Sequence, residues 1–358
     1  MSGSNGTHEQ AKPVHHKAHT PHTPRDSLTH SPKLGRLDPC NSLADFTLGV
    51  VLGHGSFGRV TLGKHKATKT VCAIKALSKA QIIKNQQVSH LRAERDILKI
   101  VDCHFIVKAQ GFFHDEHCVY FVLECVNGGE FFRHLRSRGR LTEDQARFYA
   151  AEVLLAFQYF HSKEVVYRDL KPENILLDNK GHIKITDLGF CKVVPAAKRT
   201  YTLCGTPDYL APEIILNKGH GKAVDWWAYG VLLYEFMAGY PPFFDSDVTN
   251  TYKKILGGRF TFPPHFSISS RDLIRKLLVA DLSKRYGCLA NGVDDIKNHP
   301  WFKGIDWAAA DNLVNEPPIK PTVKSVDDVS NFDDYSSLPP ILHDHVLSKT
   351  EQAMFTGF

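Results

Sequence analysis

The stretches Tyr167-Arg168-Asp169-Leu170-Lys171-Pro172-Glu173-Asn174 and Asp187-Leu188-Gly189 gather charged and amide side chains within twenty-one residues. β-Branched runs at 165–166 and 183–185 border them, a composition typical of short strands. Taken singly, such residues are more often loop caps. As an ordered set, their carboxylate and amide oxygens suit Mg²⁺, which shares its ligands with nucleotide phosphates. The two stretches therefore indicate a site that can move a phosphoryl group.

The segments upstream of residue 126 are mostly strand-like, and those downstream are mostly helical. Strands are predicted at 46–52, 59–64, 70–77, 105–113 and 118–123, with one helix at 81–100. Helices are predicted at 130–137, 142–161, 223–238, 248–256, 269–279 and 293–297. The second of these starts with a capping-box pattern at Thr142. The change of pattern predicts an α+β fold with two lobes.

Composition narrows the class of protein. The chain has 358 residues, of which 42% are hydrophobic and 23% charged, so it is globular and large enough for more than one core. The net charge of +6 comes without a run of five or six basic residues, and we expect no nucleic-acid partner. The eight cysteines are scattered without metal-ligand spacing, which favours reduced thiols.

Targeting signals are not apparent in the sequence. No apolar stretch reaches the roughly 20 residues that span a bilayer, and the nearest, 223–239, contains Asp225 and Glu235. The start resembles neither a myristoylation signal nor a secretory leader. We therefore expect no membrane anchor and a cytoplasmic location, with the nucleus as a second compartment.

The two ends differ from the middle of the chain. Residues 1–43 are rich in His, Ser and Pro and have no periodic pattern, which predicts disorder. The histidines there could hold a metal ion, but disorder explains the composition without one. From Glu316 the chain is proline-rich and acidic, and we expect an irregular tail that packs on the rest.

Gly53-His54-Gly55-Ser56-Phe57-Gly58-Arg59-Val60 lies between predicted strands. Glycines let a backbone approach phosphate oxygens, although a simple hairpin turn also explains them. Because no helix follows, the pattern argues against a dinucleotide-binding site. Lys75 sits in an apolar strand, where an ammonium group needs a partner, and Glu94 is the candidate. The alternative is that both are ordinary surface charges.

The glycine pattern, Lys75, Glu94, the two stretches quoted first and Ala211-Pro212-Glu213 follow one another in this order. Together they resemble the protein-kinase signature over residues 46–302. The stretch 202–213 and the ending Phe355-Thr356-Gly357-Phe358 resemble the AGC group of serine/threonine kinases, especially catalytic subunits of cyclic-AMP-dependent kinases. The resemblance implies an N-lobe at 44–126, a C-lobe at 127–302 and a C-terminal tail at 303–358 that wraps both.

The resemblance also implies ATP and Mg²⁺ as cofactors. Asp169 would orient the substrate hydroxyl, Lys171 would stabilise the transferred group, and Thr206 would contact both. Asn174 and Asp187 would hold Mg²⁺. The remaining implied nucleotide positions are Gly53, Gly55, Ser56, Phe57, Gly58, Val60, Ala73, Lys75, Glu94, Glu124 and Phe332.

Further positions concern the substrate. The resemblance implies that four carboxylates bind arginines that precede the target residue: Glu130, Glu173, Asp208 and Glu235. It also implies an apolar pocket for the substrate residue after the target, formed by Leu203, Pro207 and Leu210. The implied substrate is a protein or peptide of the form Arg-Arg-x-Ser/Thr-apolar. Thr202 matches an activating phosphorylation site, whose phosphate would meet Arg168, His90 and Lys192.

Other implied contacts are regulatory. Tyr201 stands where relatives carry a tryptophan that meets a regulatory subunit, so a partner with cyclic-nucleotide-binding domains is expected, together with pseudosubstrate inhibitors. Phe355 and Phe358 would dock on the small lobe. Ser348 and Thr350 are candidate phosphorylation sites in the tail.

The chain also departs from the family pattern. Leu188 replaces a phenylalanine, which leaves the balance of active and inactive states open, and Asp208 replaces a glutamate. Two alternatives remain at this point. One is a nucleotide-binding pseudokinase that acts as a scaffold, and the other is an AGC kinase that responds to cyclic GMP or lipid signals.

Overall fold

The computed structural model describes residues 42–55, 57–338 and 346–358. The expected disordered segment therefore lies outside the described residues except for Ser42 and Leu43, and so does Ser56. Ser42 starts a short 3-10 helix at Leu43–Asp45, where its side chain and that of Asp45 form a capping box. The described part of the chain thus begins just before the first predicted strand.

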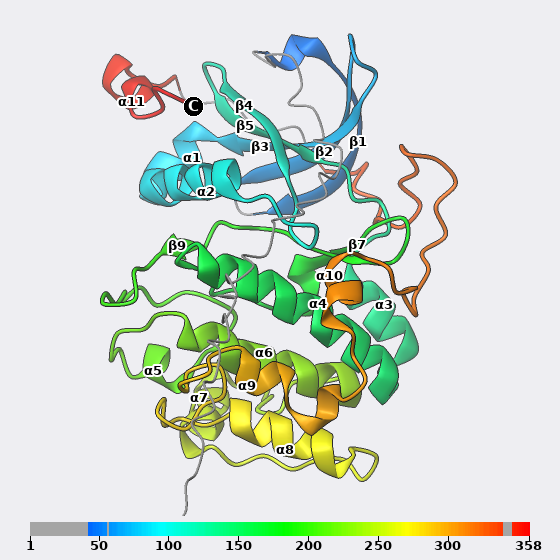
Figure 1. Ribbon diagram of the computed structural model, residues 1–358. Coiled ribbons are helices and arrows are strands. Elements are labelled where there is room, and N and C mark those ends of the chain that lie inside the picture. The colour runs from blue at the N-terminus through cyan, green and yellow to red at the C-terminus, as the bar shows by residue number, and fades with distance from the viewer. Residues whose placement is uncertain (1–41, 56, 339–345) are drawn as a thin grey trace, which may run out of the picture. The chain divides into compact units, whose positions relative to one another are not determined.

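The first part of the chain forms a five-stranded antiparallel sheet, as the sequence predicts (Figure 1). Its strand order is β1-β2-β3-β5-β4. The strands are β1 (Phe46–Gly55), β2 (Gly58–His65), β3 (Val71–Ser78), β4 (Ala109–His114) and β5 (Cys118–Glu124). The sheet positions β3, which carries Lys75, beside β2 and β5.

The single helix predicted at 81–100 is wrong, because two helices occupy this region. α1 (Lys79–Lys84) ends at Asn85, and α2 (Val88–Ile100) follows it. Between them, Gln86 has a φ of 55°, in the left-handed region that interrupts a right-handed helix. Because the helix is broken there, α1 and α2 can point in different directions.

The strand predicted at 105–113 begins later than expected, at Ala109. The residues before it instead join the strand β8 (Ile183–Ile185) through an isolated bridge between Ile106 and Ile185. Phe105 and Ile106 are fully buried there. The apolar residues Phe105 and Ile106, predicted to start a strand, thus connect the sheet to the helical part.

The helical part is built around two long helices, α4 (Glu143–Ser162) and α6 (Ala223–Ala238). The others in this part are α3 (Phe131–Arg138), α5 (Pro212–Ile215), α7 (Val248–Gly257), α8 (Ile268–Leu277), α9 (Asp294–Lys297) and α10 (Trp307–Asp311). The last helix, α11 (Lys349–Ala353), lies beside the sheet instead (Figure 1). α6 is buried along almost its whole length, which explains its uniformly apolar sequence. No helix in the described part of the chain is long and apolar enough to cross a membrane.

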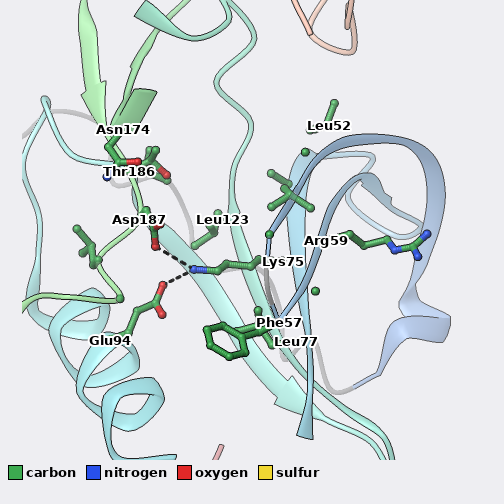
Figure 2. A pocket seen from close by; sticks show the side chains of 18 of the residues that line it. Leu52, Phe57, Arg59, Lys75, Leu77, Glu94, Leu123, Asn174, Thr186 and Asp187 are labelled. Carbon is green, nitrogen blue, oxygen red and sulfur yellow. Dashed lines mark hydrogen bonds and ion pairs between the residues drawn. The ribbon is translucent and has the colours of Figure 1, made fainter. Parts of the chain in front are cut away.

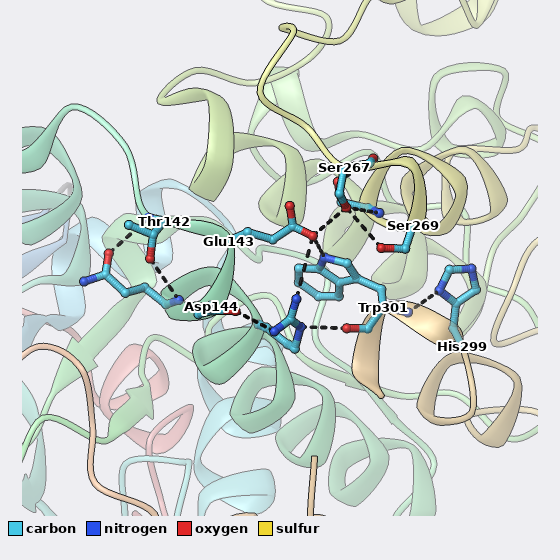
Figure 3. Close-up of polar contacts among 10 residues, drawn as sticks. Thr142, Glu143, Asp144, Ser267, Ser269, His299 and Trp301 are labelled. Carbon is cyan, nitrogen blue, oxygen red and sulfur yellow. Dashed lines mark hydrogen bonds and ion pairs between the residues drawn. The ribbon is translucent and has the colours of Figure 1, made fainter. Parts of the chain in front are cut away.

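Polar contacts fix the beginning of α4 (Figure 3). Thr142 and Gln145 form the predicted capping box. The carboxylate of Glu143 accepts hydrogen bonds from the Ser267 hydroxyl at 2.6 Å and from the Trp301 indole at 2.8 Å. Because Ser267 caps α8, this one carboxylate joins three segments that are far apart in the sequence.

Two small two-stranded sheets hold the stretches Tyr167–Asn174 and Asp187–Gly189. β6 (Val165–Val166) pairs with β9 (Lys192–Val193), and β7 (Ile175–Leu177) pairs with β8. Asp169 lies between β6 and β7, Asn174 directly precedes β7, and Asp187 follows β8. The short strands predicted on both sides of the site are therefore confirmed.

The end of the chain packs beside the sheet and helices α1 and α2 (Figure 1). The side chain of Phe355 is fully buried, and the Lys79 ammonium lies 5.1 Å from its ring centre. The Arg95 guanidinium lies 4.6 Å from the ring centre of Phe358. The predicted docking of the two phenylalanines is confirmed. Ser348 caps α11, and its phosphorylation stays a prediction.

We expect Phe355→Ala to lower the free energy of unfolding by about 3 kcal/mol, because it removes a buried ring and leaves a cavity. Urea denaturation measures the change. Phe244→Ala is a matched control, since Phe244 is 57% exposed and should cost less than about 1 kcal/mol. Equal losses in the two variants would show that the docked tail does not stabilise the fold.

Candidate active site

A cavity of about 510 Å³ lies between the sheet, α2 and the residues around the β7–β8 hairpin (Figure 2). All described residues that were predicted to contact the nucleotide line it: Gly53, Gly55, Phe57, Gly58, Val60, Ala73, Lys75, Glu94, Glu124 and Phe332. Asn174 and Asp187 line it as well. The sequence therefore identified one continuous surface from segments that are far apart in the chain.

The glycines of the β1–β2 turn differ in their structural reasons. A Cβ atom at Gly58 would lie 1.8 Å from the carbonyl oxygen of Ala76, so β2 and β3 could not approach each other with any other residue there. A Cβ atom at Gly53 or Gly55 would meet nothing within 4 Å. Gly58 is thus needed for packing, whereas the other two leave the backbone open toward the cavity.

Lys75 is the central cation of the cavity. Its Nζ lies 2.7 Å from Glu94 Oε1 and 3.4 Å from Asp187 Oδ1 (Figure 2). Burial alone would lower the pKa of Lys75, but the two carboxylates together raise it above its usual range. Lys75 lowers the pKa of Asp187 in turn. The surface-charge alternative for Lys75 and Glu94 is wrong, because both are largely buried and paired.

Asp169 lies at the centre of a compact polar group. The Thr206 hydroxyl donates to Asp169 Oδ1 at 3.0 Å, and Lys171 Nζ donates to the Thr206 hydroxyl at 3.1 Å. The Asn174 amide donates to Asp169 Oδ2 at 2.8 Å. Burial raises the pKa of Asp169, although Lys171 and these hydrogen bonds oppose the rise. Each predicted catalytic side chain thus holds the next in place.

Two of the seven described non-glycine residues with a positive φ lie at the same place. Arg168 has a φ of 70° and Asp187 a φ of 54°, both in the left-handed region that side chains other than glycine seldom adopt. Such conformations cost about 1–3 kcal/mol and persist only when surrounding contacts enforce them. Asp225 supplies such contacts, since its buried carboxylate accepts the backbone N–H groups of Tyr167 and Arg168 at 3.0 and 2.9 Å.

A cationic cluster lies beside the segment 200–204, which contains Thr202: burial raises the pKa of Cys204 there, and Arg168 and Lys192 oppose the rise. The Arg168 side chain is 6% exposed, and its Nη1 has no hydrogen-bond partner among the described residues. Lys192 donates to the Thr200 hydroxyl at 3.0 Å. Burial lowers the pKa of His90, and Arg168 and Lys192 lower it further. A buried guanidinium without an anion is costly, so this cluster is suited to receive one.

An acidic cluster lies near Asp169. Burial and then Glu173 raise the pKa of Asp208. Burial, Asp333 and Glu173 raise that of Glu130. Burial raises the pKa of Glu235 to about 7, with Glu173 and Asp208 adding to the effect. Glu173 is therefore a charged neighbour of the other three carboxylates that were predicted to read arginines, Glu130, Asp208 and Glu235.

The predicted apolar pocket is only partly assembled. Leu210 is buried and lines a small cavity with Arg168 and Thr206. Leu203 is 65% exposed and is not among the residues that line this cavity. Pro207 starts a 3-10 helix at Pro207–Tyr209 and is half-buried. Leu203 and Pro207 therefore offer apolar surface rather than a closed pocket.

Sequence reasoning missed three residues that build the site. Asp225 was given no role in the site from the sequence, although its place in an apolar run indicated that its carboxylate is buried. His220 is buried, its Nε2 has no partner among the described residues, and burial followed by Arg168 lowers its pKa to about 4. Tyr209 donates a hydrogen bond to Glu235. No local pattern marks His220 or Tyr209 as part of the site.

Known proteins match most of the chain in sequence. The family model described as protein kinase domain matches residues 46–302, and that described as protein kinase C terminal domain matches 323–358. The human cAMP-dependent protein kinase catalytic subunit PRKX is 48% identical over 83% of this chain and 82% of its own length.

Two yeast relatives are similar to a comparable degree. The Saccharomyces cerevisiae cAMP-dependent protein kinase type 3 is 49% identical over 82% of this chain and 74% of its own. Serine/threonine-protein kinase YPK1 of the same yeast is 46% identical over 88% of this chain and 47% of its own. With the cavity, the Lys75–Glu94 pair and the Asp169 group, these matches show that the chain belongs to the protein-kinase family, as an ATP-using AGC-type serine/threonine kinase similar to the cAMP-dependent kinases.

Proposed function

We propose that this kinase phosphorylates serine or threonine residues that follow arginines in protein substrates. The acidic cluster of Glu130, Glu173, Asp208 and Glu235 is the observation that carries the proposal. A carboxylate can pair with both N–H groups of a guanidinium in one plane, which a lysine ammonium cannot match. An arginine-rich segment beside Asp169 would relieve the repulsion among these carboxylates.

In the proposed reaction, Asp169 orients the substrate hydroxyl toward the γ-phosphoryl group and accepts its proton. Lys171, which donates a hydrogen bond to Thr206, stabilises the negative charge on the transferred phosphoryl group. Lys75, held by Glu94, binds the α and β phosphates. Catalysis then consists mainly of positioning and charge neutralisation.

The donor atoms in the cavity suit magnesium. Asn174 and Asp187 line it with amide and carboxylate oxygens, the hard donors that Mg²⁺ prefers. The described residues contain no group of three or more His, Cys, Asp or Glu that could hold a metal ion. A magnesium site with two protein ligands and phosphate oxygens fits this arrangement, and the ion would neutralise phosphate charge there.

Replacing Glu173 tests the substrate preference. We expect Glu173→Ala to lower kcat/KM for Arg-Arg-Ala-Ser-Leu by about tenfold or more, because one charge-assisted pair of about 1.5–3 kcal/mol is lost. The same change should barely affect a peptide without arginines, which a randomised peptide library would measure. Glu116→Ala, an exposed carboxylate on the β4–β5 turn, is the matched control. An unaltered library profile in Glu173→Ala would refute the assignment.

We also propose that phosphorylation of Thr202 activates the kinase. Thr202 is half-buried two residues after Thr200, whose hydroxyl contacts Lys192. A phosphate would bring nearly two negative charges to the cluster of Arg168, Lys192 and His90. Since His90 lies on α2 with Glu94, the phosphate would connect α2 to the catalytic stretch.

Thr202→Ala should therefore reduce peptide turnover by at least about tenfold, as one or more charge-assisted contacts worth about 1.4 kcal/mol cannot form. Mass spectrometry must first establish that the unaltered protein carries the phosphate. Thr249→Ala, at an exposed threonine of α7, should leave turnover unchanged. Equal turnover of phosphorylated protein and Thr202→Ala would contradict the proposed activation.

A regulatory partner with cyclic-nucleotide-binding domains and pseudosubstrate inhibitors belong to the same proposal. Several relatives are named as catalytic subunits of cAMP-dependent kinases, whereas YPK1, of similar identity, is not. Identity alone therefore does not separate the two kinds of AGC kinase. Tyr201 supports the partner, because its ring is 62% exposed and lies against Gly219, where any Cβ would clash with it.

We expect a cAMP-binding regulatory subunit to inhibit the kinase and cyclic AMP to reverse the inhibition. Tyr201→Ala should weaken inhibition by about tenfold or more, the effect of removing an aromatic interface anchor. Its peptide turnover should not change. Tyr240→Ala provides a control at another exposed tyrosine. Absence of inhibition at micromolar regulatory subunit would exclude this kind of partner.

A further inference from the structure

Glu235 differs from the other carboxylates of the acidic cluster in its depth. Its side chain is 3% exposed and lies on α6, within the core of the helical part. The Tyr209 hydroxyl donates a hydrogen bond to its Oε2. A carboxylate buried this far needs a close cation if it is to keep its charge.

The nearest cation does not meet that need. Arg136 Nη2 lies 3.9 Å from Glu235 Oε1, beyond hydrogen-bond distance. Its Nη1 donates to the carbonyl oxygen of Gly239 at 3.1 Å, and its guanidinium carbon lies 4.6 Å from the ring centre of Phe132. The Arg136 side chain is 52% exposed, so water screens its charge. Arg136 is thus held by other contacts and leaves Glu235 short of positive charge.

The other groups that face Glu235 come from two short helical turns. Glu173 lies on the 3-10 helix Pro172–Asn174, and Asp208 and Tyr209 lie on Pro207–Tyr209. Burial is the largest cause of the raised pKa of Glu235, which is about 7. The Tyr209 hydrogen bond and Arg136 oppose the rise, and Glu173 and Asp208 add to it. The carboxyl group therefore exchanges its proton within the neutral pH range.

Resting on the arginine-reading function proposed above, we propose that Glu235 is a proton-gated arginine subsite. In its protonated form it is a neutral partner for Tyr209 and offers little attraction to a guanidinium. When a substrate arginine binds, the carboxyl proton leaves to solvent and an ion pair replaces it. Selection for arginine at this subsite should strengthen as the pH rises from 6 to 8.

The test compares peptides rather than absolute rates. Arg-Arg-Ala-Ser-Leu is measured beside two versions in which one arginine is replaced by citrulline, a neutral isostere. The ratio of kcat/KM for the parent and each citrulline peptide cancels the titration of Asp169 and ATP, which all three peptides share. For the arginine that Glu235 reads, we expect the ratio to rise about tenfold from pH 6 to pH 8, following ionisation of a group near pH 7.

Two substitutions should move this profile in opposite directions. Tyr209→Phe removes a donor that favours the charged carboxylate, so the midpoint should shift to higher pH. Asp208→Asn removes a neighbouring negative charge, so the midpoint should shift to lower pH. Glu235→Gln should give a ratio that does not change with pH. A purely structural role of these residues would change rates without this pattern.

The outcomes separate the two proposals. If arginine gives no advantage over citrulline at any pH, the proposed substrate class is wrong, and this inference falls with it. If the advantage is large but constant from pH 6 to pH 8, or if the two substitutions shift the midpoint in the same direction, only the proton gate is wrong. Calorimetry at pH 6.5 in two buffers of different ionisation enthalpy should show proton release on binding of the parent peptide, and none with Glu235→Gln.

Discussion

The active site depends on the buried carboxylate of Asp225. It lies on α6 and accepts the backbone N–H groups of Tyr167 and Arg168, as well as a hydrogen bond from His161 at 2.8 Å. These bonds hold the backbone at Arg168 in a conformation that it would not adopt alone, and Asp169 follows directly. Because α6 is enclosed by the core, a rigid element thereby determines the direction of the Asp169 carboxylate.

The sequence predicted the parts of the site that are local. The glycine pattern, the apolar strand around Lys75 and the polar stretch at Asp169 each carry their signal within a few residues, and the structure brings them to one cavity. The prediction failed where a distant segment decides the outcome. Phe105 and Ile106 are apolar enough for a strand of the large sheet, yet their backbone pairs with β8 instead. The burial of His220 likewise depends on contacts that no local pattern encodes.

The two charged clusters lie at opposite ends of one short stretch. Arg168 faces the cations beside Thr202, and Glu173 faces the carboxylates around Glu235, with Asp169 between them. Each cluster has an excess of one sign of charge in partly buried surroundings, where screening by solvent is weak. The free chain is therefore electrostatically unsatisfied at two places. A phosphate on one side and an arginine-rich peptide on the other are the groups that would compensate it.

The docked end of the chain has a consequence for nucleotide affinity. Arg95, which covers the ring of Phe358, is the neighbour of Glu94, which holds Lys75 in the cavity. Both residues belong to α2, so the tail and the cavity act on the same rigid helix. Thermodynamic linkage is reciprocal: whatever factor the seated tail contributes to nucleotide affinity, the bound nucleotide returns to the seating of the tail. A substitution in the last four residues that alters the seating of the tail then changes nucleotide affinity, although these residues do not contact the nucleotide.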